Sequence, residues 1–326
     1  MSARWLVRFS AGGKRSGDDR GDRRPLSLFN EASRTGVRNM KVGFIGVGLM
    51  GQGMAENLIR CGHRLTVLAH RNRAPIESLM QLGASEAETA AKLAEDSEVI
   101  FLCLPNSKVV EDIIGTLRPL LKKDALIIDT STAEPSATQR LQADLAASGI
   151  GLVDAPVAGG PKQARDGELG AMVGGAPADV QRAVPLLECF CREVSVFGGP
   201  GTGNTAKLMS NYLVLGMVAL ITETFQHARA ADIDWQKLYA VMLCGSGNSG
   251  ALRRIMDAAV EGDLDGYPFS IANAAKDSAY VMSMLRTMQR TTPLAEAVNQ
   301  VYVRAQSAGD PQRFVSRLMA ESSLIE

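Results

Sequence analysis

The sequence lacks the features that mark several common classes of protein. Lys plus Arg number 35 and Asp plus Glu number 35, so the charge gives no reason to expect a nucleic-acid partner or a membrane surface. The five cysteines are scattered and odd in number, which indicates reduced thiols in a cytoplasmic protein rather than a disulfide framework. Cys61 and Cys103 fall within segments that we expect in the core.

Two further absences concern metals and membranes. Cys189 and Cys191 lack the spacing of metal ligands, and the three histidines form no cluster with them, so we expect no metal. No secretory signal peptide and no run of about 18 apolar residues is visible, so we expect no membrane span.

Residues 1–39 differ in composition from the rest of the chain. They carry nine Lys or Arg and four Asp or Glu, and no apolar period continues through them. A transit peptide would be poor in acids, which argues against that interpretation, and a basic interaction tail is an alternative. We favour a disordered leader, since Met40 stands directly before the first expected strand and offers another start for the chain.

Residues 41–63 combine a strand, a glycine-rich turn and a helix. The turn places Gly46, Gly48 and Gly51 in the spacing G-x-G-x-x-G, in which the glycines permit a tight turn, close approach of a pyrophosphate and close packing of helix on strand. Because a strand precedes the motif and a helix follows it, the motif predicts a dinucleotide site at the helix N-terminus. The cofactor-binding residues that we expect here are Gly46, Val47, Gly48, Leu49, Met50 and Gly51.

Strand and helix patterns alternate across residues 40–200, which predicts an α/β Rossmann-type domain with a doubly wound parallel sheet. The expected strands are residues 41–45, 65–69, 99–104, 125–129, 151–154, 169–173 and 194–197. The expected later helices are residues 76–82, 87–95, 109–121, 135–147 and 177–189.

The pattern changes at the glycine-rich stretch GGPGTGN, residues 198–204. Only helical patterns follow it, so residues 201–326 are expected to form an all-α domain. Its expected helices are residues 205–231, 234–243, 252–260, 272–288, 293–308 and 312–322. Ligand sites tend to lie in clefts between domains, so the start of the first of these helices is expected beside the cofactor.

The end of the second strand favours NADP over NAD. An acid at this point binds the ribose 2′-OH of NAD, whereas a basic group accommodates the 2′-phosphate of NADP. No acid occurs until Glu77, and Arg71 and Arg73 can pair with a phosphate through charge-assisted hydrogen bonds. The residues that we expect to contact this part of the cofactor are His70, Arg71, Asn72 and Arg73.

Five stretches together resemble the β-hydroxyacid dehydrogenase family over about residues 41–323. They read GFIGVGLMGQGMAENL (43–58), DTSTAEP (129–135), GLVDAPVAGGPKQARDGELGAMVGG (151–175), GTGNTAKLMSN (201–211) and FSIANAAKD (269–277). The resemblance implies a nicotinamide-dependent oxidoreductase acting on a CH–OH group, with a helical second domain like that of 6-phosphogluconate dehydrogenase. It implies a small carbonyl acid or semialdehyde as substrate, such as the semialdehyde that corresponds to 3-hydroxyisobutyrate, or tartronate semialdehyde.

By this resemblance Lys207 matches the family's catalytic lysine, within G-x-G-x-x-x-K-x-x-x-N. An ammonium can stabilise the alkoxide that forms when a carbonyl receives hydride, and it can donate the proton. Asn211 stands four residues later, hence on the same helix face, and is expected to orient the lysine or to bind the substrate oxygen.

The stretch DAPVAGG matches the family's substrate loop, and the resemblance assigns Ala158, Gly159 and Gly160 to the substrate. The family's usual serine is here Ala158, which removes one hydroxyl donor, so a larger or less polar carbonyl compound becomes plausible unless Thr132 or Lys276 compensates. Further cofactor contacts are implied for Leu104, Pro105, Thr132 and Lys276.

Two other functions remain open from the sequence. An imine reductase would share the opening motif and the helical second domain, but Lys207 counts against it because the resemblance to those enzymes does not usually include this lysine. A non-catalytic module that binds NADP would typically have replaced the lysine. For the enzyme, the resemblance implies a homodimer or homotetramer built through the helical domain.

Overall fold

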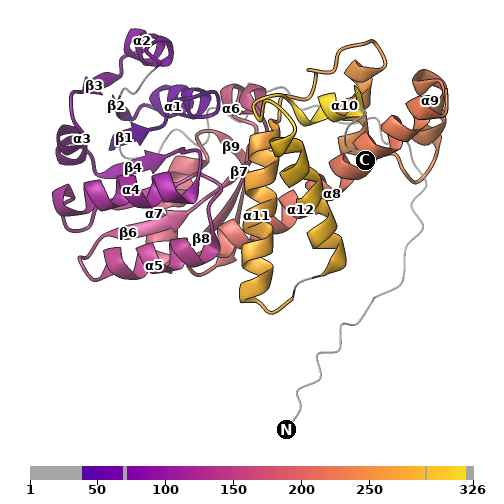
Figure 1. The fold of residues 1–326 in the computed structure, drawn as a ribbon. Helices are drawn as coiled ribbons and strands as arrows, with labels where there is room; N and C mark the ends of the chain where they lie inside the picture. Colours follow the sequence, from indigo (N-terminus) through magenta and orange to yellow (C-terminus); the bar gives the residue numbers. More distant parts are fainter. Residues whose placement is uncertain (1–38, 69–71, 291, 321–326) are drawn as a thin grey trace, which may run out of the picture. The chain divides into compact units, whose positions relative to one another are not determined.

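The computed structural model describes residues 39–68, 72–290 and 292–320. The expected leader lies outside these ranges except for its last residue, and so do His70 and Arg71. The α/β fold followed by helices, as expected from the sequence, is confirmed (Figure 1).

The described strands form one sheet of nine, in the order β3-β2-β1-β4-β5-β6-β8-β7, with β9 paired to β8. The strands are β1 (Lys41–Ile45), β2 (Arg64–Leu68), β3 (Ser85–Ala87), β4 (Val99–Leu102), β5 (Leu126–Asp129), β6 (Gly151–Asp154), β7 (Val157–Ala158), β8 (Leu169–Gly175) and β9 (Cys191–Gly198). Strands β1 to β6 run parallel, and the order reverses between β1 and β4, which is where ligands bind in such sheets. Strand β8 is antiparallel to β6 and β7, so the sheet is mixed rather than wholly parallel.

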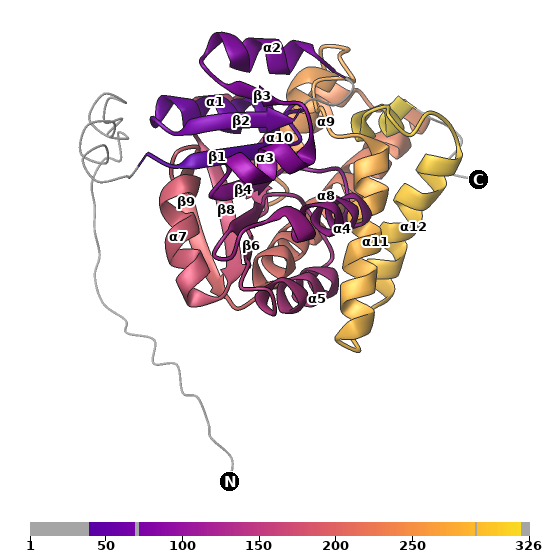
Figure 2. The same ribbon diagram turned by 90° about the vertical axis from the view of Figure 1, so that its left-hand side faces the viewer.

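Helices cover both faces of the sheet because the central strands are buried on both sides (Figures 1 and 2). One face packs against α1 (Gly51–Arg60), α2 (Ala74–Gln81), α6 (Pro161–Asp166) and α7 (Pro177–Leu187). The other face packs against α3 (Ala90–Asp96), α4 (Ser107–Leu117) and α5 (Pro135–Ala146), with the short 3₁₀ helix η1 (Arg118–Leu120) after α4. These are the two layers that a doubly wound sheet requires.

The helical part is built around α8 (Thr202–Ala230), which contacts each of the helices that follow it. These are α9 (Trp235–Cys244), α10 (Gly250–Ala259), α11 (Ile271–Thr287), α12 (Pro293–Ser307) and the 3₁₀ helix η2 (Val315–Ala320). Phe225, Ile255 and Tyr302 lie at the centre of the shared core and are at most 1% exposed. Several of these helices begin at a Ser, Thr or Asp whose side chain accepts a backbone N–H of the first turn, for example Ser270 at α11.

Three elements were absent from the sequence prediction. Strand β3 has the sequence SEA, whose single apolar residue gives no strand pattern. The strand forms because it pairs with β2 at the edge of the sheet. Strand β7 lies inside the stretch DAPVAGG and helix α6 follows it directly, and both are too short to show a period. Helix α3 begins at Ala90 rather than at Ala87, because Ala87 belongs to β3 and Thr89 caps the helix.

Two other expectations were wrong. Residues 312–322 were expected to form a helix, but the carbonyls of Pro311 and Arg313 instead accept the first amides of α11. Of the described residues up to 320, Val315–Ala320 forms a 3₁₀ helix. Cys61 was expected in the core, but it lies at the C-terminal cap of α1 and is exposed. None of the five cysteines, all of which the structure describes, is part of a disulfide.

Among the described helices, α8 is long and apolar enough to cross a membrane by length and composition. Its most apolar window has a mean hydropathy of 1.4 and is 33% buried. Core helices of proteins that do not enter membranes meet the same criterion, so the expectation that the chain has no membrane span stays a prediction.

Candidate active site

The glycine-rich turn joins β1 to α1 at the point where the strand order reverses. Gly46 has φ +103°, and a Cβ there would lie 2.1 Å from the carbonyl oxygen of Cys103. A Cβ on Gly51 would lie 2.1 Å from the carbonyl oxygen of Gly46, so the helix can approach the turn only without a side chain. Nothing lies within 4 Å of a Cβ on Gly48, which leaves space over the turn.

The N-terminus of α1 is chemically suited to a pyrophosphate. The capping residue Met50 supplies no side-chain hydrogen bond, and the first turn holds no acid. The first amides of a helix have no partner within the helix. That of Gln52 donates to the carbonyl of Gly48 at 3.0 Å, which leaves the amides of Gly51 and Gly53 to bind an anion. Leu49 stands at the turn with 83% of its surface exposed, and Val47 is partly buried against the core.

The end of β2 contains an ion pair that the sequence analysis missed. The guanidinium of Arg73 donates to both carboxylate oxygens of Glu86 on β3, at 2.5 and 2.9 Å. The side chain of Asn72 accepts the amide of Ala74 at 3.2 Å, so it shapes the start of α2. Glu86 was overlooked because it lies on the unpredicted strand β3, where it is the register partner of Val67.

The carboxyl ends of β4 and β5 are joined by side-chain hydrogen bonds. The amide of Leu104 donates to the hydroxyl of Ser131 at 2.8 Å, and the amide of Ser131 donates to the carboxylate of Asp129 at 3.0 Å. Lys276 on α11 reaches this edge and donates to the carbonyl of Pro105 at 2.9 Å. The structure thus brings Leu104, Pro105 and Lys276 together, and it places the partly buried Thr132 on the next loop along the sheet edge.

Two buried carboxyl groups lie side by side beneath this edge. Asp129 and Asp154 are register partners at the ends of β5 and β6, and they are 2% and 1% exposed. Burial raises the pKa of Asp129 to about 7, against the hydrogen bonds from Ser131. Burial also raises the pKa of Asp154 to about 6, against its bonds from backbone amides.

Asp154 fixes the start of α8 to the sheet. Its two carboxylate oxygens accept the amides of Gly201 and Asn204, each at 2.8 Å. The side chain of Asn204 then accepts the amide of Ala133 at 3.0 Å and donates to the hydroxyl of Thr138 at 3.1 Å. These contacts hold the first turn of α8 against the end of β6 and against α5, and Lys207 stands on the next turn.

Lys207 lies in a cluster of charged and polar groups from α8 and α11. Burial lowers the pKa of Lys207, Lys276 lowers it further, and Asp277 raises it. The side chain of Asn211 donates to Oδ2 of Asp277 at 2.8 Å. The other oxygen of Asp277 lies 3.1 Å from Nζ of Lys276 but is not aligned for a hydrogen bond. The predicted residues Lys207, Asn211 and Lys276 are therefore gathered around one buried carboxylate.

The substrate loop ends at a short helix. Ala158 is half-buried on β7, Gly159 is exposed with φ +126°, and Gly160 caps the N-terminus of α6. The amide of Gly160 already donates to the side chain of Gln163 at 3.0 Å, so Gly160 has less capacity to bind a carboxylate than the sequence analysis expected. Strand β7 pairs with β8, which also contacts α8.

Sequence reasoning missed three residues that organise this site: Asp277, Asn204 and Tyr280. Asp277 is adjacent to Lys276 in the sequence, but its interaction with Lys207 depends on the packing of α8 against α11. Asn204 ends the glycine-rich stretch, and a polar residue at the start of an expected helix is a signal for capping contacts. The hydroxyl of Tyr280 accepts the amide of Ser107 at 2.9 Å, a contact across 173 positions that no local pattern reveals. No group of three or more His, Cys, Asp or Glu among the described residues could hold a metal ion.

Known families and proteins match this chain over most of its length. Residues 41–199 match the family described as the NAD binding domain of 6-phosphogluconate dehydrogenase, and residues 201–320 match the family described as NAD-binding of NADP-dependent 3-hydroxyisobutyrate dehydrogenase. The 3-sulfolactaldehyde reductase of Escherichia coli is 33% identical over 272 residues, which are 82% of this chain and 91% of that protein. The 2-hydroxy-3-oxopropionate reductase of the same organism is 35% identical over 217 residues, which are 65% of this chain and 73% of that protein.

A solved structure described as Psf3 in complex with NADP+ and 2-OPP has the same fold, with a TM-score of 0.76. It is 25% identical and covers 86% of this chain and 99% of that one. The glycine-rich turn, the order of the sheet and the extent of these matches lead to one conclusion. The chain belongs to the β-hydroxyacid dehydrogenase family and is a nicotinamide-dependent oxidoreductase that acts on a CH–OH group.

Proposed function

We propose that this enzyme uses NADPH to reduce a small carbonyl acid or semialdehyde, and that Lys207 is its general acid and base. The observation that carries this proposal is the cluster of Lys207, Asn211, Lys276 and Asp277. The lowered pKa of Lys207 and the contact of Lys276 with Pro105 at the sheet edge support the proposal.

The chemistry assigned to each group follows from this arrangement. When bound, NADPH would supply the hydride that the carbonyl carbon of the substrate receives. The electron pair of the C=O bond moves to the oxygen, and the Lys207 ammonium gives that oxygen its proton. Lys207 is then neutral and regains a proton from solvent. In the oxidative direction the neutral amine takes the hydroxyl proton, and the lowered pKa makes that form accessible.

NADP preference is supported by the absence of an acid in residues 69–73 and by the NADP+ complex of a similar protein. Arg73 supports it less than the sequence suggested, because Glu86 already neutralises its guanidinium. Arg71 lies outside the described residues. The turn, the first amides of α1, Leu104 and Lys276 would hold the rest of the cofactor.

The substrate is proposed by chemical class. Related enzymes are named for sulfolactaldehyde and for 2-hydroxy-3-oxopropionate, which are both small aldehydes that carry an acidic group. In this chain Ala158 offers no hydroxyl and the amide of Gly160 is engaged, so an acidic group would depend more on other donors. Lys207 argues against an imine reductase and against a non-catalytic module that only binds NADP.

NADPH oxidation across a panel of carbonyl compounds tests the function. The panel contains tartronate semialdehyde, methylmalonate semialdehyde, succinic semialdehyde, sulfolactaldehyde and glyoxylate, with a cyclic imine as the counter-example. We expect turnover with at least one carbonyl acid and a higher kcat/KM with NADPH than with NADH. Turnover of the imine alone would refute the proposed substrate class, and a preference for NADH would refute the proposed cofactor.

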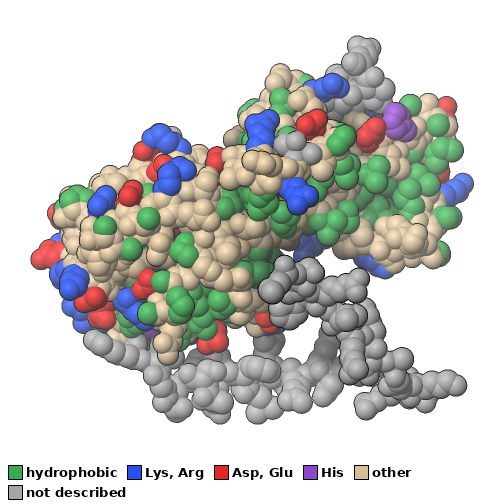
Figure 3. Space-filling model, turned by 90° about the horizontal axis from the view of Figure 1, so that it is seen from below, with side chains coloured by type: hydrophobic (Ala, Val, Ile, Leu, Met, Phe, Trp, Pro, Cys, Tyr) green, Lys and Arg blue, Asp and Glu red, His purple; other side chains and the backbone are tan. Residues whose placement is uncertain are grey.

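We also propose that residues 40–200 bind the cofactor and that residues 201–326 serve substrate binding and assembly. The proposed assembly is a cytoplasmic homodimer or homotetramer formed through the helical part. Met209, Leu213 and Leu220 on α8 are 41%, 64% and 66% exposed. Figure 3 shows apolar side chains gathered over the helical part of the molecule. An exposed apolar face of this kind is typical of a protein interface.

A further inference from the structure

Helix α6 follows the substrate loop and has only six residues, from Pro161 to Asp166. An isolated helix of this length is unstable, because nucleation costs more than so few hydrogen bonds return. Its last carbonyls also lack partners within the helix. Its position therefore has to be set by contacts with the rest of the fold.

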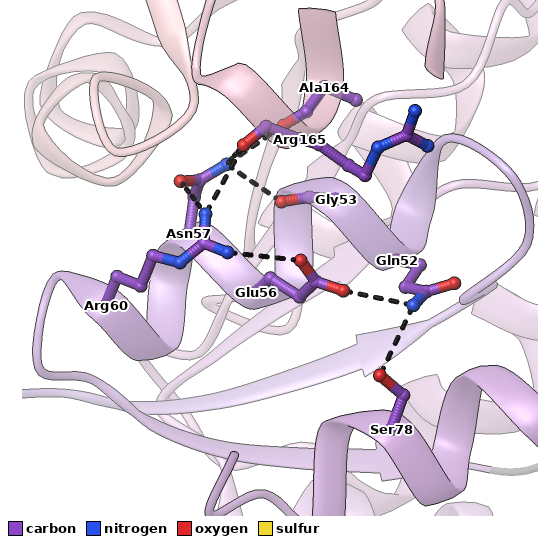
Figure 4. Close-up of polar contacts among 8 residues, drawn as sticks. All are labelled: Gln52, Gly53, Glu56, Asn57, Arg60, Ser78, Ala164 and Arg165. Atoms are coloured by element: carbon purple, nitrogen blue, oxygen red, sulfur yellow. Dashed lines mark hydrogen bonds and ion pairs between the residues drawn. The ribbon is translucent and has the colours of Figure 1, made fainter. Parts of the chain in front are cut away.

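Those contacts come from the cofactor helix α1 (Figure 4). The buried side-chain amide of Asn57 donates to the carbonyl of Ala164 at 2.9 Å and to the carbonyl of Arg165 at 3.2 Å. The same amide also donates to the carbonyl of Gly53 in its own helix at 2.9 Å. Arg60 adds a weaker contact to the carbonyl of Arg165 at 3.3 Å and donates to Oδ1 of Asn57. Asn57 thus caps the C-terminus of α6 across a separation of more than 100 residues.

Gly53 makes this approach possible. A Cβ at Gly53 would lie 2.6 Å from the backbone nitrogen of Arg165 and 2.7 Å from the backbone carbon of Ala164. Both are backbone atoms, so they cannot move aside as a flexible side chain would. Gly53 is not one of the three glycines of the G-x-G-x-x-G motif, and its role is contact with α6 rather than with the cofactor.

The other end of α6 begins at the substrate loop. Gly160 is its capping residue and is tied to Gln163 within the first turn. Ala164 is fully buried between these two ends. A shift of α6 on α1 would therefore be transmitted to Gly159 and Gly160.

We propose that Asn57 is a positioning residue for the substrate loop: by fixing α6 on the cofactor helix, it sets where the loop stands relative to the cofactor. The role of the loop in substrate binding rests on the proposed function, but the attachment of α6 to α1 does not. Loss of Asn57 should weaken substrate capture and leave cofactor binding in place.

Three variants isolate this contact. Asn57→Leu keeps a similar volume and removes the donor, and Gly53→Ala disturbs the same contact by placing a Cβ against the backbone of Ala164 and Arg165. Ser78→Ala is the matched control, because Ser78 accepts Gln52 at the far end of the same polar network and is linked to α6 indirectly, through Gln52, Glu56 and Arg60 (Figure 4).

The first measurement needs no substrate. Amide hydrogen exchange of residues 157–168 is followed with and without NADP+, and NADPH affinity is followed by fluorescence. We expect exchange in α6 to become about tenfold faster in Asn57→Leu and Gly53→Ala, since two hydrogen bonds from the side chain of Asn57 hold the helix end. The NADPH Kd of Asn57→Leu should stay within about twofold, as for sites that do not interact.

The second measurement uses whichever panel compound the wild type reduces. The KM for the carbonyl compound should rise about tenfold in both variants, with kcat changed far less, and Ser78→Ala should match the wild type. Unchanged exchange in α6 would overturn the proposal, as would an equal weakening of nucleotide and substrate binding. If no panel compound is reduced, the proposed function fails while exchange and nucleotide affinity still decide whether Asn57 fixes α6.

Discussion

Lys207 is the residue whose protonation the site controls most directly. Burial disfavours its ammonium, and Lys276 adds repulsion, while the carboxylate of Asp277 favours the charged form. In the proposed mechanism Lys207 must be protonated for reduction, so the pH at which reduction falls off on the alkaline side should follow the pKa of Lys207. The nearby acid therefore extends the pH range over which the enzyme can act as a reductase.

Asp277→Asn should move the alkaline limb of kcat/KM for reduction to lower pH. The substitution removes the one group that raises the pKa of Lys207, and an amide can still accept the hydrogen bond from Asn211. The check is a pH profile of NADPH oxidation for the wild type and the variant. Asp265→Asn is the control, since Asp265 pairs with Arg317 in the helical part, and it should leave the limb in place. A limb that does not move in Asp277→Asn would show that Lys207 does not set it.

Ala158→Ser should increase activity on small aldehydes that carry a carboxylate. The added hydroxyl supplies a donor at a half-buried position of the substrate loop, and one such bond can change kcat/KM about tenfold. The comparison is kcat/KM for tartronate semialdehyde and for the preferred substrate in both forms. An equal change for an uncharged aldehyde would contradict the assignment of this position to the acidic group.

Among the secondary-structure elements, the ends of β5 and β6 carry a pH dependence of stability. Asp129 and Asp154 have raised pKa values in the folded protein. Between about pH 4, where a carboxyl of the unfolded chain titrates, and these raised values, the folded protein therefore binds more protons than the unfolded chain. Their contribution to stability is therefore complete below about pH 4. It is lost as the pH rises through about 6 and about 7.

Asp129→Asn should flatten this dependence. The amide oxygen can still accept the amide of Ser131, and the buried charge that forms near neutral pH is removed. We expect the fall in unfolding free energy between pH 5 and 8 to shrink by about 2 kcal/mol, measured by chemical denaturation. His63 has a lowered pKa and acts in the opposite direction in both proteins, so the difference between them isolates Asp129. An identical fall in both proteins would show that Asp129 stays charged throughout.

For the whole molecule, the exposed apolar face of α8 should control assembly. Leu213→Glu places a charge in the centre of the proposed interface and should shift the protein to a smaller species, as measured by light scattering after size-exclusion chromatography. Leu82→Glu, on an exposed apolar residue of the α/β part, should leave the assembly unchanged. A monomeric wild type, or a Leu213→Glu variant that keeps the same mass, would contradict this role for α8.

The sequence predicted those parts of the fold whose signal is local. Strand β1 was predicted with its observed bounds because its apolar run ends at a glycine turn, and the helices after residue 200 were found by their period. Strand β3 and helix α6 were missed because they are held by pairing with β2 and by capping from Asn57, which are contacts between distant residues. The pairing of Arg73 with Glu86 was missed for the same reason. Lys207 was assigned from a motif, but the acid that tunes it became visible only when α8 and α11 were placed together.

Lys207→Ala provides the most direct test of the proposed chemistry. NADPH oxidation with the best panel substrate and the Kd for NADPH are measured in the wild type and the variant. We expect kcat to fall by about 10² to 10⁴, the range that a positioned proton donor contributes, while NADPH binding is retained. A variant that keeps the wild-type kcat would show that Lys207 does not transfer the proton, and the assignment of this site would be wrong.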